Sequence, residues 1–251
     1  MRRYTKSFIF DPTLLKTGHK CRKKRPSVRE SAFSCTDGHI SRFPVTPGGG
    51  YYYLEIEKEG TGLAPWFNYI GVTLAVLKYR MPNGHFETTL SDVQEAVKIM
   101  RQHTEDWGVN PERVGVMGCS AGGNLAIQAS VQFTSREHRP DFQILLYPFT
   151  TMNDFENNIM FGPNPSEELI KKYSVLDHVK PDTPRAFIAC SADDSIVPFD
   201  DSIKYFKELQ AHKIPSVLHI YPTGGHGWCE GPWFHYSREW KMELERWLSE
   251  L

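Results

Sequence analysis

The feature that most constrains the fold of this chain is a series of short, strand-like segments separated by segments of helical character. The strand-like segments are residues 72–77, 114–117, 142–147, 186–190 and 216–221. The first is a continuous apolar run rich in β-branched residues, which is typical of a strand buried on both faces of a sheet. Strands that alternate with helices imply right-handed crossovers and a mainly parallel sheet. We therefore expect an α/β fold with helices flanking a central sheet.

Two of the intervening segments carry specific helix signals. Ser91 and Gln94 form a potential capping box, so we expect a helix to begin there and to end at Gly108. The C-terminal segment carries a stripe of large apolar residues at helical spacing, consisting of Trp240, Leu244, Trp247 and Leu251. We expect both helices to pack against the sheet.

Size and composition describe a globular chain rather than a membrane or fibrous one. The chain has 251 residues, 40% hydrophobic and 24% charged, with a formal net charge of -1, which suits one hydrophobic core. No apolar run approaches the ~20 residues of a membrane span, and residues 8–10 are too short for the core of a signal peptide. We expect a cytoplasmic protein. Five scattered cysteines without a CxxC pair predict neither a zinc site nor a disulfide framework.

The N-terminal segment differs from the rest of the chain. Residues 1–30 contain ten Lys or Arg against two acidic residues. The basic run at residues 22–25 suits an anionic surface, but the remaining chain is acidic and carries no nucleic-acid-binding motif. We expect residues 1–45 to form a loosely structured arm with at most short strands, residues 46–251 to form the main domain, and neither nucleic acid nor membrane as a partner.

A serine stands where a strand is expected to turn into a helix. Residues 118–122, with Ser120 at the centre, form a GxSxG pattern that is weak alone but typical of a nucleophile elbow in this position. Only small neighbours let the backbone turn sharply while exposing the hydroxyl. The helix that follows favours negative charge at its N-terminus. The alternative is a glycine-rich turn that binds phosphate or merely packs.

A nucleophilic serine requires a base and an acid that orients it. Among ten histidines, His226 lies in a glycine-rich loop after the last expected strand, where it can reach the edge of the sheet at which ligands bind. Asp193 and Asp194 follow the strand before it, and we prefer Asp194 as the acid because it precedes Val197 and Pro198 in a D-x-x-V-P context. The order of serine, aspartate and histidine is that of α/β-hydrolases.

Three consecutive glycines follow Pro47. Glycine lets backbone N–H groups approach an anion closely. We expect Gly49 and Gly50, together with Ala121, to donate hydrogen bonds to the oxyanion of a tetrahedral intermediate. A triple glycine is by itself more often a plain loop.

These motifs together resemble the α/β-hydrolase superfamily, and within it the bacterial acetyl esterases and acetylxylan esterase-like proteins. The matching stretches are residues 47–51, 77–82, 118–123, 194–198 and 224–228. The resemblance implies a catalytic triad of Ser120, Asp194 and His226, and a serine esterase that removes short acyl groups, acetyl first, from small molecules or oligosaccharides such as acetylated xylan. It implies neither a cofactor nor a metal. The alternatives are a peptidase of the same fold and a binding protein on a hydrolase scaffold.

Two features bear on how well such a site would work. Arg42 and Pro44 interrupt the strand that such proteins usually carry before the glycine loop, so we expect either reduced N-terminal strands or a poorly supported oxyanion loop. Aromatic residues adjoin the motifs, and we expect Tyr51 and Trp228 to contact the substrate.

Overall fold

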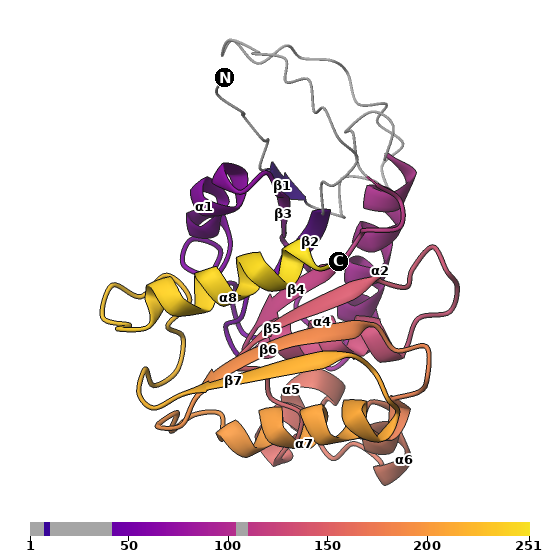
Figure 1. Cartoon of the computed structure of the whole chain (residues 1–251). Coiled ribbons are helices and arrows are strands. Elements are labelled where there is room, and N and C mark those ends of the chain that lie inside the picture. Colours follow the sequence, from indigo (N-terminus) through magenta and orange to yellow (C-terminus); the bar gives the residue numbers. More distant parts are fainter. Residues whose placement is uncertain (1–7, 11–41, 104–109) are drawn as a thin grey trace.

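A computed structural model describes residues 8–10, 42–103 and 110–251, and these residues form one parallel sheet with helices on both faces (Figure 1). The seven strands run in the order β1-β3-β2-β4-β5-β6-β7, and every neighbouring pair is parallel. They are β1 (Phe8–Phe10), β2 (Arg42–Thr46), β3 (Thr73–Leu77), β4 (Val116–Cys119), β5 (Phe142–Leu146), β6 (Arg185–Ser191) and β7 (Ser216–Tyr221). The expected α/β-hydrolase architecture is confirmed.

The helices connect these strands in the manner of βαβ units. The α-helices are α1 (Ala64–Tyr69), α2 (Phe86–Gln102), α4 (Ala121–Val131), α5 (Asp154–Phe161), α6 (Glu167–Lys172), α7 (Phe199–Ala211) and α8 (Ser237–Ser249). Two short 3-10 helices, η2 and η3, cover Thr61–Leu63 and Leu176–His178. Within the described ranges, no helix combines the length and the apolar character needed to cross a bilayer.

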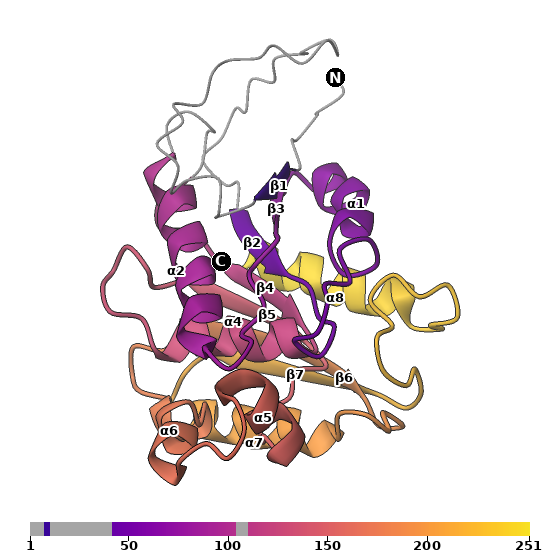
Figure 2. The same ribbon diagram turned by 180° about the vertical axis from the view of Figure 1, so that it is seen from behind.

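Both faces of the sheet carry an apolar core, because side chains alternate between them. In β5, Leu145 packs into the core beneath α2, α4 and α7, while its neighbours Ile144 and Leu146 pack into the core beneath α1 and α8. Figure 1 shows α8 across the front of the sheet, and Figure 2 shows α2 and α4 on the opposite face. Both faces of the central strands are therefore buried, which explains why these strands read as continuous apolar runs.

The strand before the glycine loop forms despite its proline, which corrects the expectation of an interrupted strand. Pro44 lies opposite Ala75 in the ladder with β3, but the ladder with β4 begins only at Val45. Its missing N–H therefore removes no hydrogen bond from the ladder with β4. The N-terminal end of the sheet is short rather than missing, because β1 pairs with β3 over three residues. The division of the chain at residue 45 stays a prediction.

One local expectation was wrong. The helix expected to begin at Ser91 begins at Phe86, and the Ser91 hydroxyl donates to the Thr88 carbonyl within it instead of capping it. The apolar face of α2 extends back to Phe86, which is fully buried, so packing overrides the local capping signal. Its expected end at Gly108 lies outside the described residues.

Candidate active site

The expected nucleophile lies on a strained turn between β4 and α4. Ser120 has φ 53° and ψ -122°, values that non-glycine residues rarely adopt. The flanking glycines leave no room for a side chain, since a Cβ at Gly118 would lie 2.0 Å from the Gly122 carbonyl oxygen. A Cβ at Gly122 would lie 1.9 Å from the Thr46 carbonyl oxygen. The glycine spacing of the motif is thus a requirement of close backbone packing between the elbow and β2.

The three residues expected to form a triad lie in hydrogen-bond contact. His226 Nε2 is 2.8 Å from Ser120 Oγ, and His226 Nδ1 is 2.7 Å from Asp194 Oδ2. The second carboxylate oxygen of Asp194 accepts the N–H groups of Ile196 and Val197, each at 2.9 Å. The Asp194 side chain is completely buried and that of His226 is 14% exposed. This geometry can hold an imidazole in one orientation against a serine hydroxyl.

Asp193, the alternative acid, has a different partner. Its carboxylate accepts the Gly225 N–H at 2.8 Å, one residue before His226. This hydrogen bond lowers the pKa of Asp193. The two adjacent carboxylates therefore divide their contacts: Asp194 meets the imidazole, and Asp193 meets the backbone of the loop that carries it.

The loop of three glycines packs directly against the elbow. A Cβ on Gly48 would lie 2.9 Å from the Cβ of Ser120, and Gly49 and Gly50 have φ of 122° and 62°. Among the described hydrogen bonds, none takes the N–H of Gly49 or Gly50, whereas the Gly48 N–H donates to Glu59. Ala121 is the first residue of α4. The three expected oxyanion donors therefore belong to backbone segments that adjoin Ser120.

Side chains in the core hold this loop in place, so the alternative of a poorly supported loop does not apply. Tyr79 Oη donates to the Pro47 carbonyl at 2.6 Å, and the Gly48 N–H donates to Glu59 Oε2 at 2.6 Å. Both side chains are buried. Support comes from the segment after the loop and from the segment that follows β3, which the interrupted pattern before the loop could not reveal.

The two aromatic residues expected to contact substrate lie in the interior, so their burial does not support that role. Trp228 is 0% exposed and stacks on Phe234, with ring centroids 4.2 Å apart. Tyr51 is 2% exposed and donates through its hydroxyl to Asn124 at 2.9 Å. The exposed aromatic side chains of the loop are instead its neighbours Tyr52 and Tyr53, which are 60% and 57% exposed.

Glu59 and Tyr147 are site residues that the sequence analysis missed. Tyr147 follows β5 with φ 39°, and its ring lies edge-on to that of His226, with centroids 4.9 Å apart. Its hydroxyl donates to Glu59 Oε1 at 2.8 Å. Glu59 lies in a segment of mixed charge that looks like a solvated turn, and the only signal for Tyr147 was its place at the end of an expected strand.

The surroundings of Ser120 are of low polarity. Burial raises the pKa of the thiols of Cys119 and Cys229 and of the Tyr147 hydroxyl. Burial also raises the pKa of Glu59, against the hydrogen bonds from Tyr147 and Gly48. In the described part of the chain, no three His, Cys, Asp or Glu side chains gather as a metal site would require.

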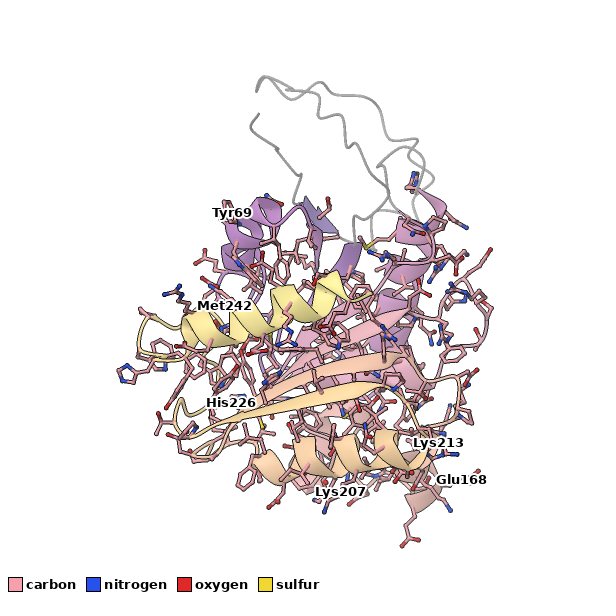
Figure 3. All side chains as sticks on the ribbon, in the orientation of Figure 1. Tyr69, Glu168, Lys207, Lys213, His226 and Met242 are labelled. Atoms are coloured by element: carbon pink, nitrogen blue, oxygen red, sulfur yellow. The ribbon has the colours of Figure 1, made fainter. Side chains whose placement is uncertain are left out.

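Figure 3 shows His226 at one end of the sheet and Lys213 at the other. The triad lies at the end where the parallel strands finish, since its members follow β4, β6 and β7. This is the edge at which open α/β sheets bind ligands.

A profile of the alpha/beta hydrolase fold matches residues 46–230 of the chain. The chain belongs to this family.

Two curated proteins and one solved structure illustrate the similarity. The chain is 34% identical to an acetylxylan esterase of Xylanibacter ruminicola, over 82% of the chain and 44% of that protein. It is 29% identical to endo-1,4-beta-xylanase B of Butyrivibrio fibrisolvens, over 73% of the chain and 32% of that protein. It thus spans less than half of either relative. The crystal structure of an acetyl ester-xyloside bifunctional hydrolase from Caldicellulosiruptor lactoaceticus matches with a TM-score of 0.79 and 29% identity, covering 86% of this chain and 85% of that one.

Proposed function

We propose that this chain is a serine esterase that hydrolyses short carboxylic esters, acetyl esters first, by way of an acyl-enzyme. The observation that carries the proposal is the continuous contact from Ser120 through His226 to Asp194, at 2.8 Å and 2.7 Å. A nucleophile, a base and an orienting acid at these separations are the components of acyl transfer.

The reaction begins with His226 neutral. With its proton on Nδ1, the imidazole donates to Asp194, and Nε2 is left to accept the proton of the Ser120 hydroxyl. Oγ attacks the ester carbonyl, and the N–H groups of Gly49, Gly50 and Ala121 stabilise the oxyanion. His226 then protonates the departing alcohol, and water activated in the same way releases the carboxylic acid and restores the serine.

The names of two similar proteins suggest carbohydrate esters as substrates of this chain. Among the similar proteins are an acetylxylan esterase and an acetyl ester-xyloside hydrolase. The exposed rings of Tyr52 and Tyr53 follow the glycine loop and offer surfaces on which a sugar can pack. We therefore expect the alcohol part of the natural ester to be a sugar unit, such as one from acetylated xylan.

The test is hydrolysis of p-nitrophenyl acetate by the wild type and by Ser120→Ala. We expect the variant to lose hydrolysis and to keep its melting temperature, because the hydroxyl is only partly buried and contacts His226 rather than the apolar core. Ser91→Ala, which alters an exposed serine on α2, is the matched control and should keep full activity. An organophosphonate should label Ser120 alone. Activity that survives in Ser120→Ala would refute the mechanism.

A second measurement addresses the acyl group and the alcohol. We expect kcat/KM to be highest for the acetyl ester among acetyl, butyryl, hexanoyl and octanoyl p-nitrophenyl esters, because overpacking a narrow pocket costs about 1–3 kcal/mol. A maximum at hexanoyl or beyond would contradict this preference. Release of acetate from acetylated xylo-oligosaccharides tests the sugar part, and cleavage of peptides without ester hydrolysis would favour a peptidase.

A further inference from the structure

A buried carboxylate lies behind the active site and takes no part in the steps above. Glu59 is 4% exposed, and each of its two oxygens accepts one hydrogen bond. Oε2 accepts the Gly48 N–H at 2.6 Å, and Oε1 accepts the Tyr147 hydroxyl at 2.8 Å. Two accepted hydrogen bonds suit an ionised carboxylate, which has no proton to donate. Such a group is costly to bury, so its contacts require an explanation.

The first contact fixes the peptide unit that leads into the oxyanion loop. Tyr79 donates to the carbonyl of Pro47, and Glu59 accepts the N–H of Gly48, which belongs to the same peptide unit. The unit is planar, and its C=O and N–H point in opposite directions. Hydrogen bonds on both sides therefore prevent it from rotating.

This restraint matters because glycine has so little conformational preference of its own. Gly49 and Gly50 have φ of 122° and 62°, and free glycines exchange readily among many such states. Stabilisation of an oxyanion depends on donors that are oriented before the reaction begins. A fixed Gly48 peptide sets the direction in which the next two N–H groups point.

The second contact of Glu59 leads to the histidine. The Tyr147 hydroxyl that donates to Glu59 also accepts the Cys229 N–H, at 3.3 Å, in the segment that follows His226. The Tyr147 ring lies edge-on to the His226 ring. One carboxylate is thus connected both to the loop of the oxyanion donors and to the segment of the base.

We infer that Glu59 is a positioning residue that holds the oxyanion donors and the His226 segment in one geometry around Ser120. The inference rests on the proposed esterase function. Glu59 does not touch the reacting atoms in this scheme and acts through Gly48 and Tyr147.

The charged and titratable groups around Glu59 decide how a variant should be designed. Burial raises its pKa, whereas the hydrogen bonds from Tyr147 and Gly48 and the charge of His226 lower it, and Glu55 raises it. The groups that face it are Glu55, Tyr79, Cys119, Tyr147, His226 and Cys229. Glu59→Gln keeps the shape, but one of the two acceptor oxygens becomes an NH2 group, so the side chain can no longer accept from both Gly48 and Tyr147.

The first experiment separates kcat from KM for p-nitrophenyl acetate. Removal of one oxyanion donor typically lowers kcat by ~10²–10³-fold. Glu59→Gln leaves the donors present but loosely held, so we expect kcat to fall by about 10–100-fold with little change in KM. Glu57→Gln is the matched control, since Glu57 lies two residues away in the same segment and is exposed. It should keep wild-type kcat.

The second readout is the pH profile of kcat/KM, which a purely structural role would leave in place. Asp194, Glu59 and Tyr147 face His226. A negative charge favours the imidazolium form, so its removal in Glu59→Gln should move the acidic limb of the profile to lower pH. The same variant should also bind a boronic acid transition-state analogue more weakly, in proportion to the loss of kcat.

The outcomes distinguish this inference from the proposed function. Wild-type kcat and an unmoved pH profile in folded Glu59→Gln overturn the inference alone. A fall in activity that only follows the loss of folded protein, measured by thermal melting, also overturns it. If that variant does not fold, Tyr79→Phe and Tyr147→Phe each remove one hydroxyl, and unchanged kcat in both overturns it. A wild type that neither hydrolyses esters nor takes up phosphonate at Ser120 refutes the proposed function first.

Discussion

The Nε2 atom of His226 lies 2.8 Å from the Oγ of Ser120, although the two residues are 106 positions apart in the chain. They meet because β4 and β7 are strands of one parallel sheet, whose carboxyl ends share an edge. The loop after β7 carries the imidazole back across that edge, past the ends of β5 and β6. The contact is therefore a consequence of the topology of the sheet.

The two adjacent aspartates should differ sharply in their effect on activity. We expect Asp194→Asn to lower kcat by about 10⁴-fold, because an amide beside Nδ1 favours the wrong imidazole tautomer. Asp193→Asn is the control, since the Asp193 carboxylate accepts the backbone N–H of Gly225, whereas the imidazole contacts Asp194. The kcat of Asp193→Asn should fall by less than tenfold, which is about the effect of losing one exposed hydrogen bond. Equal losses in the two variants would reject Asp194 as the orienting acid.

Trp228 should matter for stability rather than for substrate choice. Its ring is completely buried, and we expect Trp228→Ala to lower the free energy of unfolding by about 3–5 kcal/mol through the cavity it leaves. Urea unfolding measures this loss. Relative to the wild type, Trp228→Ala should lose activity by the same factor toward nitrophenyl acetate and toward sugar acetates. Tyr52→Ala, which removes an exposed ring near the glycine loop, should leave the free energy of unfolding unchanged. A larger loss of stability in Tyr52→Ala than in Trp228→Ala would contradict the structural role of Trp228.

The glycine after the serine should tolerate no side chain. In Gly122→Ala the new Cβ would meet the Thr46 carbonyl oxygen at 1.9 Å, so β2 and the elbow would have to move apart. We expect a marked loss of both stability and kcat, since the displaced strand leads directly into the oxyanion loop. Gly71→Ala offers a comparison, because its φ is 81° and nothing lies within 4 Å of the added atom. Backbone strain should lower the free energy of unfolding of Gly71→Ala by about 1 kcal/mol, and its kcat should stay at the wild-type value.

Glu59 should make the stability of the protein depend on pH. Its pKa in the folded protein is raised by burial above its ordinary value of 4.5, so the folded state binds the proton more tightly than the unfolded chain does. The stability that this protonation contributes is present below that ordinary value and is lost as the pH rises through the folded pKa. The wild type should therefore lose stability relative to Glu59→Gln as the pH rises above that ordinary value. Urea unfolding of both proteins checks this, and a constant or growing advantage of the wild type would contradict it.

Much of the fold could be predicted because its signals are local. A strand buried on both faces, such as Thr73–Leu77, needs apolar residues at every position, and this is visible in a single stretch of chain. The GxSxG spacing could also be interpreted locally, since the strain at Ser120 and the close approach of Gly118 to the Gly122 carbonyl arise within five residues. The boundary of α2 could not be predicted in this way, because burial of Phe86 outweighed the capping signal at Ser91.

The sequence by itself determined the α/β architecture and identified Ser120 and His226 as the candidate nucleophile and base, because strand pattern and motif order are properties of the chain alone. Tertiary structure decided which aspartate meets His226, why a strand with Pro44 still forms, and that Tyr51 and Trp228 lie inside. It also brought Glu59 to Tyr147, 88 positions away. Such pairs form where loops from different strands converge at one edge of the sheet. Their partners are chosen by burial and by the need to satisfy buried polar groups, neither of which is encoded near either residue.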